Sequence, residues 1–460
     1  MRNRVKNVQE MRGRSLYRSA SRYSRAVKDL SRVIARRMPE NVSAGLANYE
    51  DRNLSPLRSG DLINAAELPE QNPFYPCFAD RIRAFFRERE PKVVGVSLNY
   101  LSQALPAFAM IGLLRREYPT TAIVLGGGLV TTWMRNPAWK NPFGGLVDTF
   151  VAGPGEDALM FLLGRAPAGR ELPRPDYRLL AELPYLSPGF VLPYAASSGC
   201  SWNRCSFCPE KAEANPYLPV PLPQVRADIR ALSEVFQPSL IHLVDNAVSP
   251  AVLEECALRP PGAPWYGFAR ISSQLADPAF CIALRQAGCV MLKLGIESGD
   301  QRVLDVLEKG ISIETASAVL KNLRNAGIGT YVYLLFGTPA EDETAARSTL
   351  EFAVHHADCI KHLNLAIFNM PVCGAAGSGL ETLGFSPGDL SLYTDFRHPL
   401  GWDRRRVRRF LEREFRTHPL IAPILRREPP VFTSNHAPFF LLEGSGERAP
   451  KLYKKQRTFA

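Results

Sequence analysis

The chain has few cysteines for its length and no long apolar run. Nine cysteines in 460 residues are too few for a disulfide scaffold. The longest apolar stretch, Ala104 to Leu114, is shorter than the roughly 18–20 residues that a membrane-spanning helix needs. The first residues, Met1 to Lys6, also lack the apolar segment of a secretory signal. We therefore expect a cytoplasmic protein without a membrane span.

Histidine is scarce as well, and all seven histidines lie at or after His242. The sequence contains no internal repeat and no low-complexity tract, which excludes solenoid architectures. Its apolar share of 46% is ordinary for a globular protein, and its length allows two or three domains.

The net charge of +11 is concentrated in an N-terminal arm. Residues 1–37 hold twelve basic and two acidic residues, whereas the remaining chain holds 44 basic and 43 acidic residues. Apolar residues recur in this arm at helical spacing, namely Tyr17, Ala20, Tyr23, Val27, Leu30 and Ile34. We interpret the arm as a docked helix whose arginines face solvent. Contact with a nucleic acid or an anionic surface is the alternative.

From residue 93, strands and helices alternate in the manner of a parallel sheet. We expect strands over 93–98, 122–126 and 147–152, and a helix over 102–118. Glycines follow the last two strands, where parallel sheets bind ligands and where glycine lets the backbone approach a ligand closely. The pattern predicts a Rossmann-like domain.

A second alternating series begins near residue 193. Strands are expected near 193–198, 239–245, 265–269, 290–296, 329–336 and 363–369, with helices between them. Six such units are fewer than the eight of a closed barrel. The predicted fold class is therefore α/β: a Rossmann-like parallel sheet domain, a partial (β/α)6 barrel of TIM type, and a mixed C-terminal extension.

These patterns divide the chain into four segments. They are a basic helical arm (1–60), the Rossmann-like domain (61–165), the barrel (185–375) and the C-terminal extension (376–460). Residues 165–190 are rich in Pro and Gly and are expected to form a linker. Residues 38–80 are expected to be loop-rich, and the extension is expected to contain one very basic helix over 403–417.

Three cysteines directly follow the first barrel strand. Cys200, Cys205 and Cys208 have the spacing C-x4-C-x2-C and precede Pro209. Three thiolates can each bind one iron of a cubane cluster and leave the fourth iron open to a small molecule. Zinc is the alternative, but a structural zinc site needs a fourth ligand, and the nearest histidine, His242, falls in the second barrel strand. We predict a [4Fe–4S] cluster.

A cysteine triad after the first strand of a six-strand partial barrel resembles the radical S-adenosylmethionine (SAM) superfamily. Most members space the triad C-x3-C-x2-C, and the longer spacing here is similar to a variant in members that carry a cobalamin-binding domain in front. Phe207, between the last two cysteines, keeps the family pattern. The resemblance implies that SAM chelates the open iron and is cleaved to methionine and a 5′-deoxyadenosyl radical. It also implies a low-potential electron donor as partner.

The resemblance further implies a SAM site at the carboxyl ends of the barrel strands. Asp245 would lie near the methionine amine, Glu297 and Ser298 near the ribose hydroxyls, and Gly337 beside the adenine. Phe207 and Arg270 complete the set. The alternative for each is loop polarity or helix capping, and Ser298 could cap the helix that follows it. No catalytic residue beyond the cluster is assigned.

The Rossmann-like domain resembles the cobalamin-binding domain that precedes many of these barrels. By this resemblance, cobalamin would face Ser97, Asn99, Gly127, Gly128 and Gly155. The cobalt-binding Asp-x-His-x-x-Gly loop of other cobalamin proteins cannot exist here, because no histidine precedes His242; many radical members also lack it. The first βα unit of such a domain is missing or replaced by the arm. The alternative is a domain that only packs on the barrel and shapes substrate access.

The predicted function is therefore reductive cleavage of SAM to functionalise an unreactive carbon, with methyl transfer or rearrangement if cobalamin binds. One alternative is the same chemistry without cobalamin, where the N-terminal domain is scaffold. Another is a non-catalytic iron–sulfur electron carrier or redox sensor. The sequence does not identify the substrate, which is a small molecule or a peptide.

Overall fold

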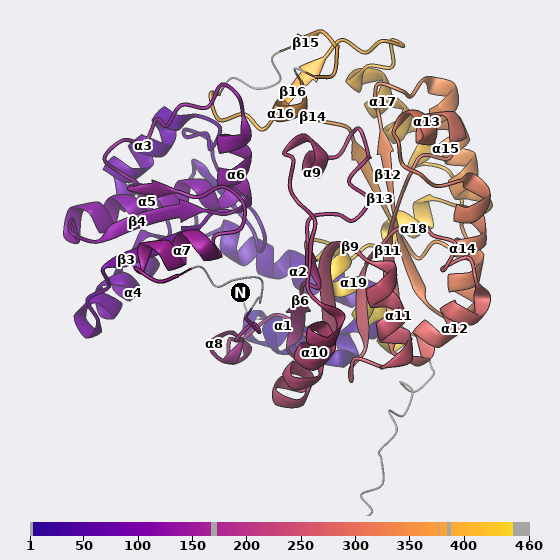
Figure 1. Cartoon of the computed structure of the whole chain (residues 1–460), viewed down its shortest axis with the longest axis horizontal. Coiled ribbons are helices and arrows are strands. Elements are labelled where there is room, and N and C mark those ends of the chain that lie inside the picture. Colours follow the sequence, from indigo (N-terminus) through magenta and orange to yellow (C-terminus); the bar gives the residue numbers. More distant parts are fainter. Residues whose placement is uncertain (1–2, 167–172, 376, 384–387, 445–460) are drawn as a thin grey trace, which may run out of the picture. The chain divides into compact units, whose positions relative to one another are not determined.

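The computed structural model of the chain describes residues 3–166, 173–375, 377–383 and 388–444 (Figure 1). Parts of the predicted linker (167–172) and of the C-terminal extension (376, 384–387 and 445–460) lie outside the described residues. The chain divides into two compact units. The barrel unit comprises Met1–Leu30, Arg174–Phe368 and His398–Ala460, and the sheet unit comprises Ser31–Pro173 and Asn369–Arg397. Compared with the predicted segments, the start of the arm groups with the barrel, and residues 369–397 group with the sheet unit.

The barrel unit is built on a six-stranded parallel sheet with the order β13-β12-β11-β10-β9-β6. Its strands are β6 (Val191–Tyr194), β9 (Leu240–Val248), β10 (Trp265–Ala269), β11 (Cys289–Glu297), β12 (Gly329–Phe336) and β13 (His362–Ile367). All six agree with the predicted ranges within a few residues. This sheet confirms the predicted α/β class and the partial barrel.

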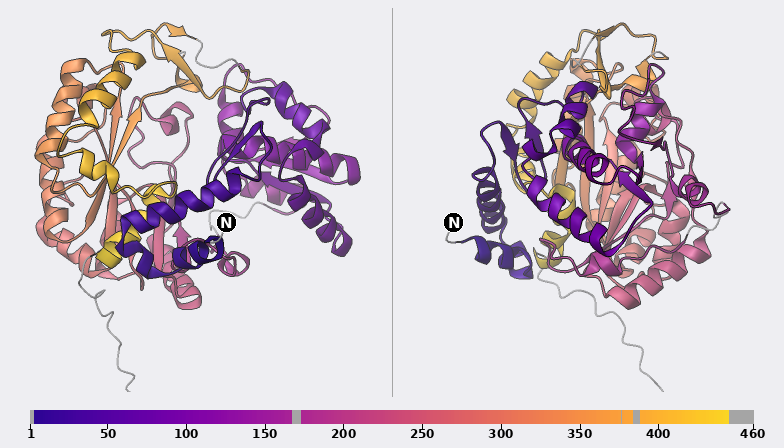
Figure 2. Two further views of the ribbon diagram at one scale, coloured as in Figure 1. Left: turned by 180° about the vertical axis from the view of Figure 1, so that it is seen from behind. Right: turned by 90° about the vertical axis from the view of Figure 1, so that its left-hand side faces the viewer.

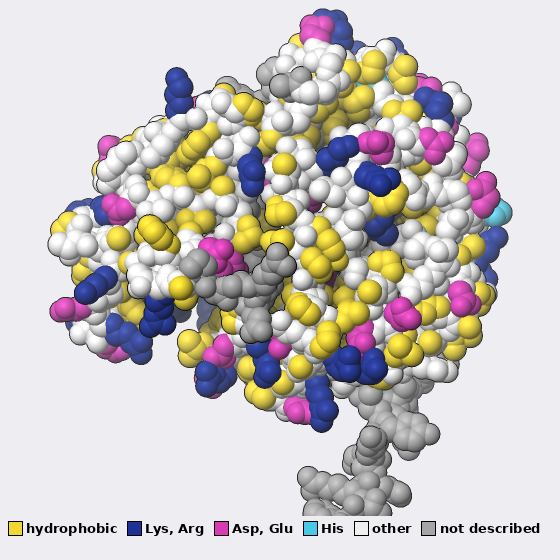
Figure 3. All heavy atoms as spheres, viewed as in Figure 1, with side chains coloured by type: hydrophobic (Ala, Val, Ile, Leu, Met, Phe, Trp, Pro, Cys, Tyr) yellow, Lys and Arg dark blue, Asp and Glu magenta, His cyan; other side chains and the backbone are white. Residues whose placement is uncertain are grey.

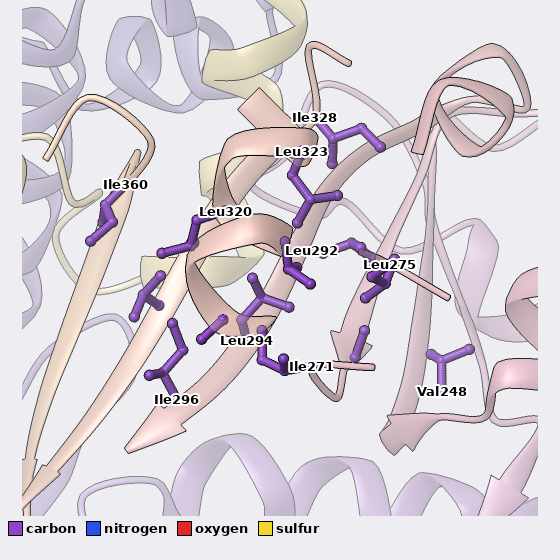
Figure 4. Packing of buried hydrophobic residues seen from close by; sticks show 14 of the residues in the cluster. Val248, Ile271, Leu275, Leu292, Leu294, Ile296, Leu320, Leu323, Ile328 and Ile360 are labelled. Carbon is purple, nitrogen blue, oxygen red and sulfur yellow. The ribbon is translucent and has the colours of Figure 1, made fainter. Parts of the chain in front are cut away.

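Helices between these strands cover the outer face of the sheet (Figure 1). They are α10 (Leu222–Phe236), α11 (Pro250–Leu258), α12 (Pro278–Gln286), α13 (Gln301–Val306), α14 (Ile313–Asn325) and α15 (Glu343–His355). Leu292 and Leu294 of β11 are fully buried in the core that contains Leu320 and Leu323 of α14, as Figure 4 shows. Every second residue of β11 therefore faces the helices, and the residues between them face the concave inner side.

The N-terminal arm forms α1 (Arg4–Met11), the 3-10 helix η1 (Arg14–Arg18) and α2 (Ala20–Ala35). The arm packs beside helix α19 (Thr433–Gly444), as the ribbons in Figure 2 show. Tyr17 and Tyr23 are buried there, and their hydroxyls lie 3.2 and 2.8 Å from His436 Nδ1. Val27 and Leu30 of the predicted stripe are buried too, whereas Ala20 is exposed. Aromatic contacts with α19 thus hold the arm in place.

The rest of the C-terminal part of the barrel unit is helical. It contains α17 (Arg404–Phe410), the π-helix η3 (Leu411–Phe415) and α18 (Ala422–Arg426). The predicted basic helix over 403–417 corresponds to α17 and η3. The sequence did not predict α19, which carries Pro438 inside the helix.

The sheet unit contains a three-stranded parallel sheet, β3 (Val93–Ser97), β4 (Ala122–Gly126) and β5 (Thr149–Phe150). Helices α5 (Leu101–Glu117) and α6 (Gly128–Arg135) connect these strands, and α7 (Glu156–Leu162) follows β5. The unit also holds the β1–β2 hairpin (Val42–Ala44 and Tyr49–Asp51) and a small antiparallel sheet of β14 (Met370–Pro371), β15 (Thr382–Leu383) and β16 (Tyr393–Phe396). The short helices η2 (Pro69–Gln71) and α16 (Val372–Ala375) belong to the sheet unit as well, whereas α8 (Arg178–Ala181) belongs to the barrel unit.

The expectation that residues 38–80 are loop-rich is wrong for the second half of that range. Helix α3 covers Ser59–Glu67, and α4 covers Tyr75–Glu88. Pro76 lies in the first turn of α4, where a missing N–H costs no hydrogen bond. Helix α3 packs against α5 so closely that a Cβ on Gly112 would lie 1.8 Å from the Ala66 carbonyl oxygen.

The surface carries charges of both signs. On the described part of the face in Figure 3, basic and acidic side chains intermingle. None of the described helices combines the length and the apolarity that a membrane span requires.

Three buried histidines make the stability of the barrel unit dependent on pH. Burial lowers the pKa of His242 to about 3 and the pKa of both His362 and His436 to about 4. The unfolded chain, with histidine pKa near 6.5, binds more protons below that pH, so stability falls as the pH drops from 6.5 toward 4. We expect each histidine to lower the free energy of unfolding by on the order of 2 kcal/mol at about pH 5. Urea unfolding at about pH 7 and pH 5 measures the loss. The His362→Phe variant should lose less by the share of one histidine, on the order of 2 kcal/mol, and equal loss in both proteins would contradict the assignment.

Candidate functional site

The three cysteines lie on the loop between β7 (Ser197–Ser198) and the short helix α9 (Pro209–Ala212), at the carboxyl end of the first barrel strand. Cys205 is buried, whereas Cys200 and Cys208 are half-buried, and all three are free thiols. Burial raises the pKa of the Cys208 thiol, while the backbone N–H groups of Glu210 and Lys211 donate hydrogen bonds to it and act in the opposite direction. The start of α9 therefore offsets part of the effect of burial, and the pKa of Cys208 stays raised.

The cysteine loop is fastened to the turn that follows α13. The Ser206 N–H donates to the Leu307 carbonyl at 3.0 Å, and Trp202 Nε1 donates to the Glu308 carbonyl at 2.9 Å. Lys211 from α9 forms an ion pair with the Glu308 carboxylate at 2.8 Å. The Trp202 ring lies on Gly310, where a Cβ would come within 2.1 Å of the ring. Two segments about a hundred residues apart in the chain thus form one rigid loop pair.

Arg270, at the end of β10, connects the two loops. Its guanidinium lies 4.4 Å above the Trp202 ring, donates to the Lys309 carbonyl at 2.5 Å and lies 3.9 Å from Cys205 Sγ. Arg270 therefore places a fixed positive charge beside the sulfur atom of Cys205.

Glu297, at the end of β11, forms an ion pair with Lys309 at 2.7 Å, and both side chains are almost buried. Glu297 has φ +69, a backbone conformation that non-glycine residues rarely adopt. Its carboxylate lies over Gly295, where a Cβ would approach it to 2.4 Å. The Lys309 ammonium also lies 5.6 Å from the Phe207 ring. Phe207, Arg270 and Glu297, all predicted for the SAM site, are therefore linked through Lys309.

Asp245 lies where β9 departs from its regular register with β10, opposite Gly267 to Ala269. Its carboxylate is buried and accepts hydrogen bonds from Ser197 Oγ at 2.6 Å and from the Ala196 N–H at 3.1 Å. Burial raises the pKa of Asp245. The residue thereby joins the second strand to the backbone just ahead of the cysteine loop.

Ser298 and Gly337 have structural roles at the ends of β11 and β12. The Ser298 hydroxyl is fully buried, lies 3.1 Å from Thr349 Oγ1 and accepts from the Asp300 N–H. The helix cap expected of it is instead made by Asp300, whose side chain accepts from the Val303 N–H. Gly337 has φ +76 and donates its N–H to Glu341.

Glu341 fixes the loop that follows β12. It is fully buried, also accepts a hydrogen bond from Trp402 Nε1 at 2.9 Å, and burial raises its pKa to about 8. The loop is thus anchored from the C-terminal part of the barrel unit.

The residues predicted for cobalamin lie at the carboxyl edge of the sheet unit. Ser97, Asn99, Gly128 and Gly155 are exposed, and Asn99 connects two loops by accepting from the Gly128 N–H at 2.8 Å. Gly127 has φ +103, and a Cβ there would meet the Leu98 carbonyl oxygen at 2.5 Å, so the turn itself requires glycine. Gly155 has open space around its Cβ position. Three strand ends therefore present polar groups and accessible backbone at one edge.

No group of three His, Cys, Asp or Glu side chains within the described ranges is arranged to hold a single metal ion. A cubane places its thiolates on different iron atoms. Its ligands therefore spread more widely than those of a mononuclear zinc site.

Residues 194–353 match the Radical SAM superfamily. This part of the chain is a radical SAM domain. The fold resembles that of the radical SAM methyltransferase TsrM from Kitasatospora setae, solved with cobalamin and a [4Fe–4S] cluster. The TM-score is 0.53 at 21% identity, over 73% of this chain and 78% of that chain.

Two further likenesses cover less of the other protein. A TsrM structure with tryptophan substrate and the SAM analogue aza-SAM gives a TM-score of 0.50 at 20% identity, over 64% of this chain and 65% of that chain. An uncharacterized methyltransferase of Pyrococcus horikoshii is 21% identical over 313 residues, which are 60% of this chain and 66% of the relative. This chain thus spans just under two thirds of that curated relative, and the structural likenesses establish a common fold.

Sequence reasoning missed several residues of the radical SAM domain and its surroundings. Lys309 stands in a turn, and only the three-dimensional contact with Glu297 distinguishes it from a solvent lysine. Trp202 lies between Cys200 and Cys205, but the sequence predicted no partner for it. Glu341 and Trp402 are 61 residues apart, so no local pattern could pair them.

Proposed function

We propose that this chain is a radical SAM enzyme that binds a [4Fe–4S] cluster on Cys200, Cys205 and Cys208 and cleaves SAM reductively. The observation that carries the proposal is the cysteine loop with the Arg270 guanidinium against Cys205 Sγ. A fixed cation beside a thiolate suits a cluster whose ligands bring negative charge. The match of residues 194–353 to the superfamily supports the same function.

The residues present fit such a cluster. Bound and reduced, a [4Fe–4S] cluster supplies the electron that breaks a carbon–sulfur bond of SAM. The burial of Cys205 keeps water from that ligand, and the α9 N–H groups hold the Cys208 thiolate. Trp202 and Lys211 keep the loop in place on the Glu308 turn. These contacts leave the loop little freedom to collapse into a disulfide.

We propose that SAM lies at the carboxyl ends of β9 to β12, among Phe207, Asp245, Arg270, Glu297, Ser298 and Gly337. Lys309 orients the Glu297 carboxylate through Oε1 and leaves Oε2 without a hydrogen bond to any residue that the structure describes, so Oε2 can accept from a ribose hydroxyl. Ser298 would have to exchange its contact with Thr349 to do the same.

We further propose that the sheet unit binds cobalamin at Ser97, Asn99, Gly127, Gly128 and Gly155, and that the reaction is a methyl transfer. Gly155 has open space around its Cβ position at the exposed edge of the sheet, and TsrM shares the fold. Nine free thiols favour the reducing cytoplasm, where a low-potential donor would reduce the cluster.

The test is formation of 5′-deoxyadenosine after anaerobic cluster reconstitution, with SAM and dithionite as reductant. We expect product from the wild-type chain and none above background from Cys205→Ala. Cys281→Ala is the matched control, because Cys281 lies on α12 and is fully buried in the core of the barrel unit, away from the cysteine loop. Its product level should stay within twofold of wild type.

Two results would contradict the proposal. Iron that fails to bind the wild-type chain would exclude the cluster, and equal product from Cys205→Ala would exclude its ligand set. Hydroxocobalamin that stays with the chain through gel filtration would support the cobalamin site, and its complete loss would favour the scaffold alternative for the sheet unit.

A further inference from the structure

The inner face of the barrel sheet is accessible to solvent except at the amino ends of its strands. Val244, on β9 next to the edge strand β6, keeps 41% of its surface exposed, and Phe268 and Tyr333 on β10 and β12 are half-buried. Helix α19 covers the amino end of β12, where a Cβ on Gly329 would lie 2.4 Å from the Leu441 side chain. Side chains nearer the carboxyl ends of the strands can therefore contact a small molecule on this face.

Lys293 lies on β11 at the boundary between the covered and the open parts. Its ammonium lies 3.1 Å from His242 Nε2 and 5.7 and 5.5 Å from the Tyr266 and Phe268 rings. Within the part of the chain that the structure describes, no carboxylate forms an ion pair with it. Lys309, which is also largely buried, has Glu297 at 2.7 Å. Lys293 is thus a largely enclosed cation without a counter-ion.

The neighbours of Lys293 keep its charge uncompensated. An ammonium can only donate, so His242 Nε2 accepts and the ring proton is on Nδ1. The His242 ring stacks on Tyr266 at 4.2 Å, and burial lowers the pKa of His242 to about 3, so it stays neutral. Burial also lowers the pKa of Lys293 to about 8, with no acidic group acting against it. Enclosing such a charge is unfavourable unless an anion joins it.

The surroundings define the rest of the ligand. The Phe268 and Tyr333 rings lie 4.9 Å apart and form an aromatic wall beside the ammonium. The Glu297 carboxylate lies over Gly295, which is two residues beyond Lys293 on the same face of β11, or about 7 Å along the strand. A molecule held at Lys293 can therefore extend along the wall toward the carboxyl ends of the strands.

We infer that Lys293 binds the carboxylate of a small substrate whose planar apolar body lies on Phe268 and Tyr333. The inference rests on the proposed function in one respect, because it makes this ligand the substrate whose far end meets the SAM site. The carboxylate accepts hydrogen bonds from the ammonium, and the planar body replaces water on the two rings. Lys293 is then a residue that determines substrate class.

The test uses the full chain and 8-anilinonaphthalene-1-sulfonate, an aromatic anion whose fluorescence reports its binding. Competitors are indole-3-propionate and its uncharged amide, indole-3-propionamide. We expect the acid to displace the probe at least tenfold better than the amide. Lys293→Met should remove this difference, whereas Lys293→Arg should keep most of it. Lys321→Met, which removes an exposed charge from α14, is the matched control and should behave as wild type.

Equal displacement by acid and amide, an unchanged preference in Lys293→Met, or no binding of the probe would each overturn the inference. The measurement needs no cluster and no SAM. Acid binding that depends on Lys293 in a chain without SAM cleavage would therefore leave the anion site standing and remove the proposed function. SAM cleavage without any role of Lys293 in acid binding would do the reverse.

Discussion

The Gly199→Ala variant is expected to lose its iron–sulfur cluster although all three cysteines remain. Gly199 precedes Cys200 and has φ +74, a conformation that costs an alanine about 1–2 kcal/mol. A Cβ would also lie 2.3 Å from the Pro216 carbonyl oxygen and 2.9 Å from its carbon. Backbone atoms cannot rotate away, so the strand end that carries Cys200 must shift. Iron content after reconstitution should fall from about four per chain to less than one.

Gly145→Ala provides the control for the backbone effect. Gly145 has φ +81 but open space around its Cβ position, and it belongs to the sheet unit. It should keep its full iron content and lose only about 1–2 kcal/mol of stability. Circular dichroism shows whether Gly199→Ala still folds. A folded Gly199→Ala chain with four irons would mean that the position of Cys200 tolerates the shift.

The Lys309→Ala variant is expected to destabilise the barrel unit by about 3–5 kcal/mol in urea unfolding. The Lys309 and Glu297 side chains are only 8% and 12% exposed, so removing the ammonium leaves a nearly buried carboxylate without its counter-ion. The strained backbone at Glu297 offers that carboxylate no easy way to reach solvent. The Lys309→Met, Glu297→Gln double variant should recover most of the loss, because neither charge remains.

Lys211→Ala is the matched control for an exposed pair. Lys211 and Glu308 are 42% and 57% exposed, so removing this ion pair should cost less than about 1 kcal/mol. If Lys309→Ala lowers the free energy of unfolding by no more than Lys211→Ala does, water reaches Glu297 freely. The proposal that Lys309 orients the Glu297 carboxylate would then be wrong.

The strands of the sheet unit and of the barrel could be predicted from the sequence because they are local patterns. Val93 to Ser97 and Gly329 to Phe336 are apolar runs bounded by polar or glycine-rich segments, and the strands occur there. The cysteine loop was equally visible, since its spacing is a property of nine consecutive positions. Such features need no knowledge of the rest of the chain.

The partners of the site residues could not be predicted, because they come from distant turns. Asp245 meets Ser197, and Trp202 meets Glu308, across 48 and 106 residues. Ser298 is a similar case: its position at a strand end was visible in the sequence, but the contact of its buried hydroxyl with Thr349 was not. Neither the direction of a side chain nor the bulge in β9 leaves a signal in hydrophobic periodicity.

The contact of the arm with α19 has a consequence for synthesis. Tyr23 and His436 are 413 residues apart, and ribosomes add roughly 5–20 residues per second, so roughly 20–80 seconds pass between the emergence of the two. During that interval the buried face of α2, with Tyr23 and Val27, has no native surface to cover it. The nascent chain therefore exposes the aromatic residues of this basic helix until α19 has been synthesised.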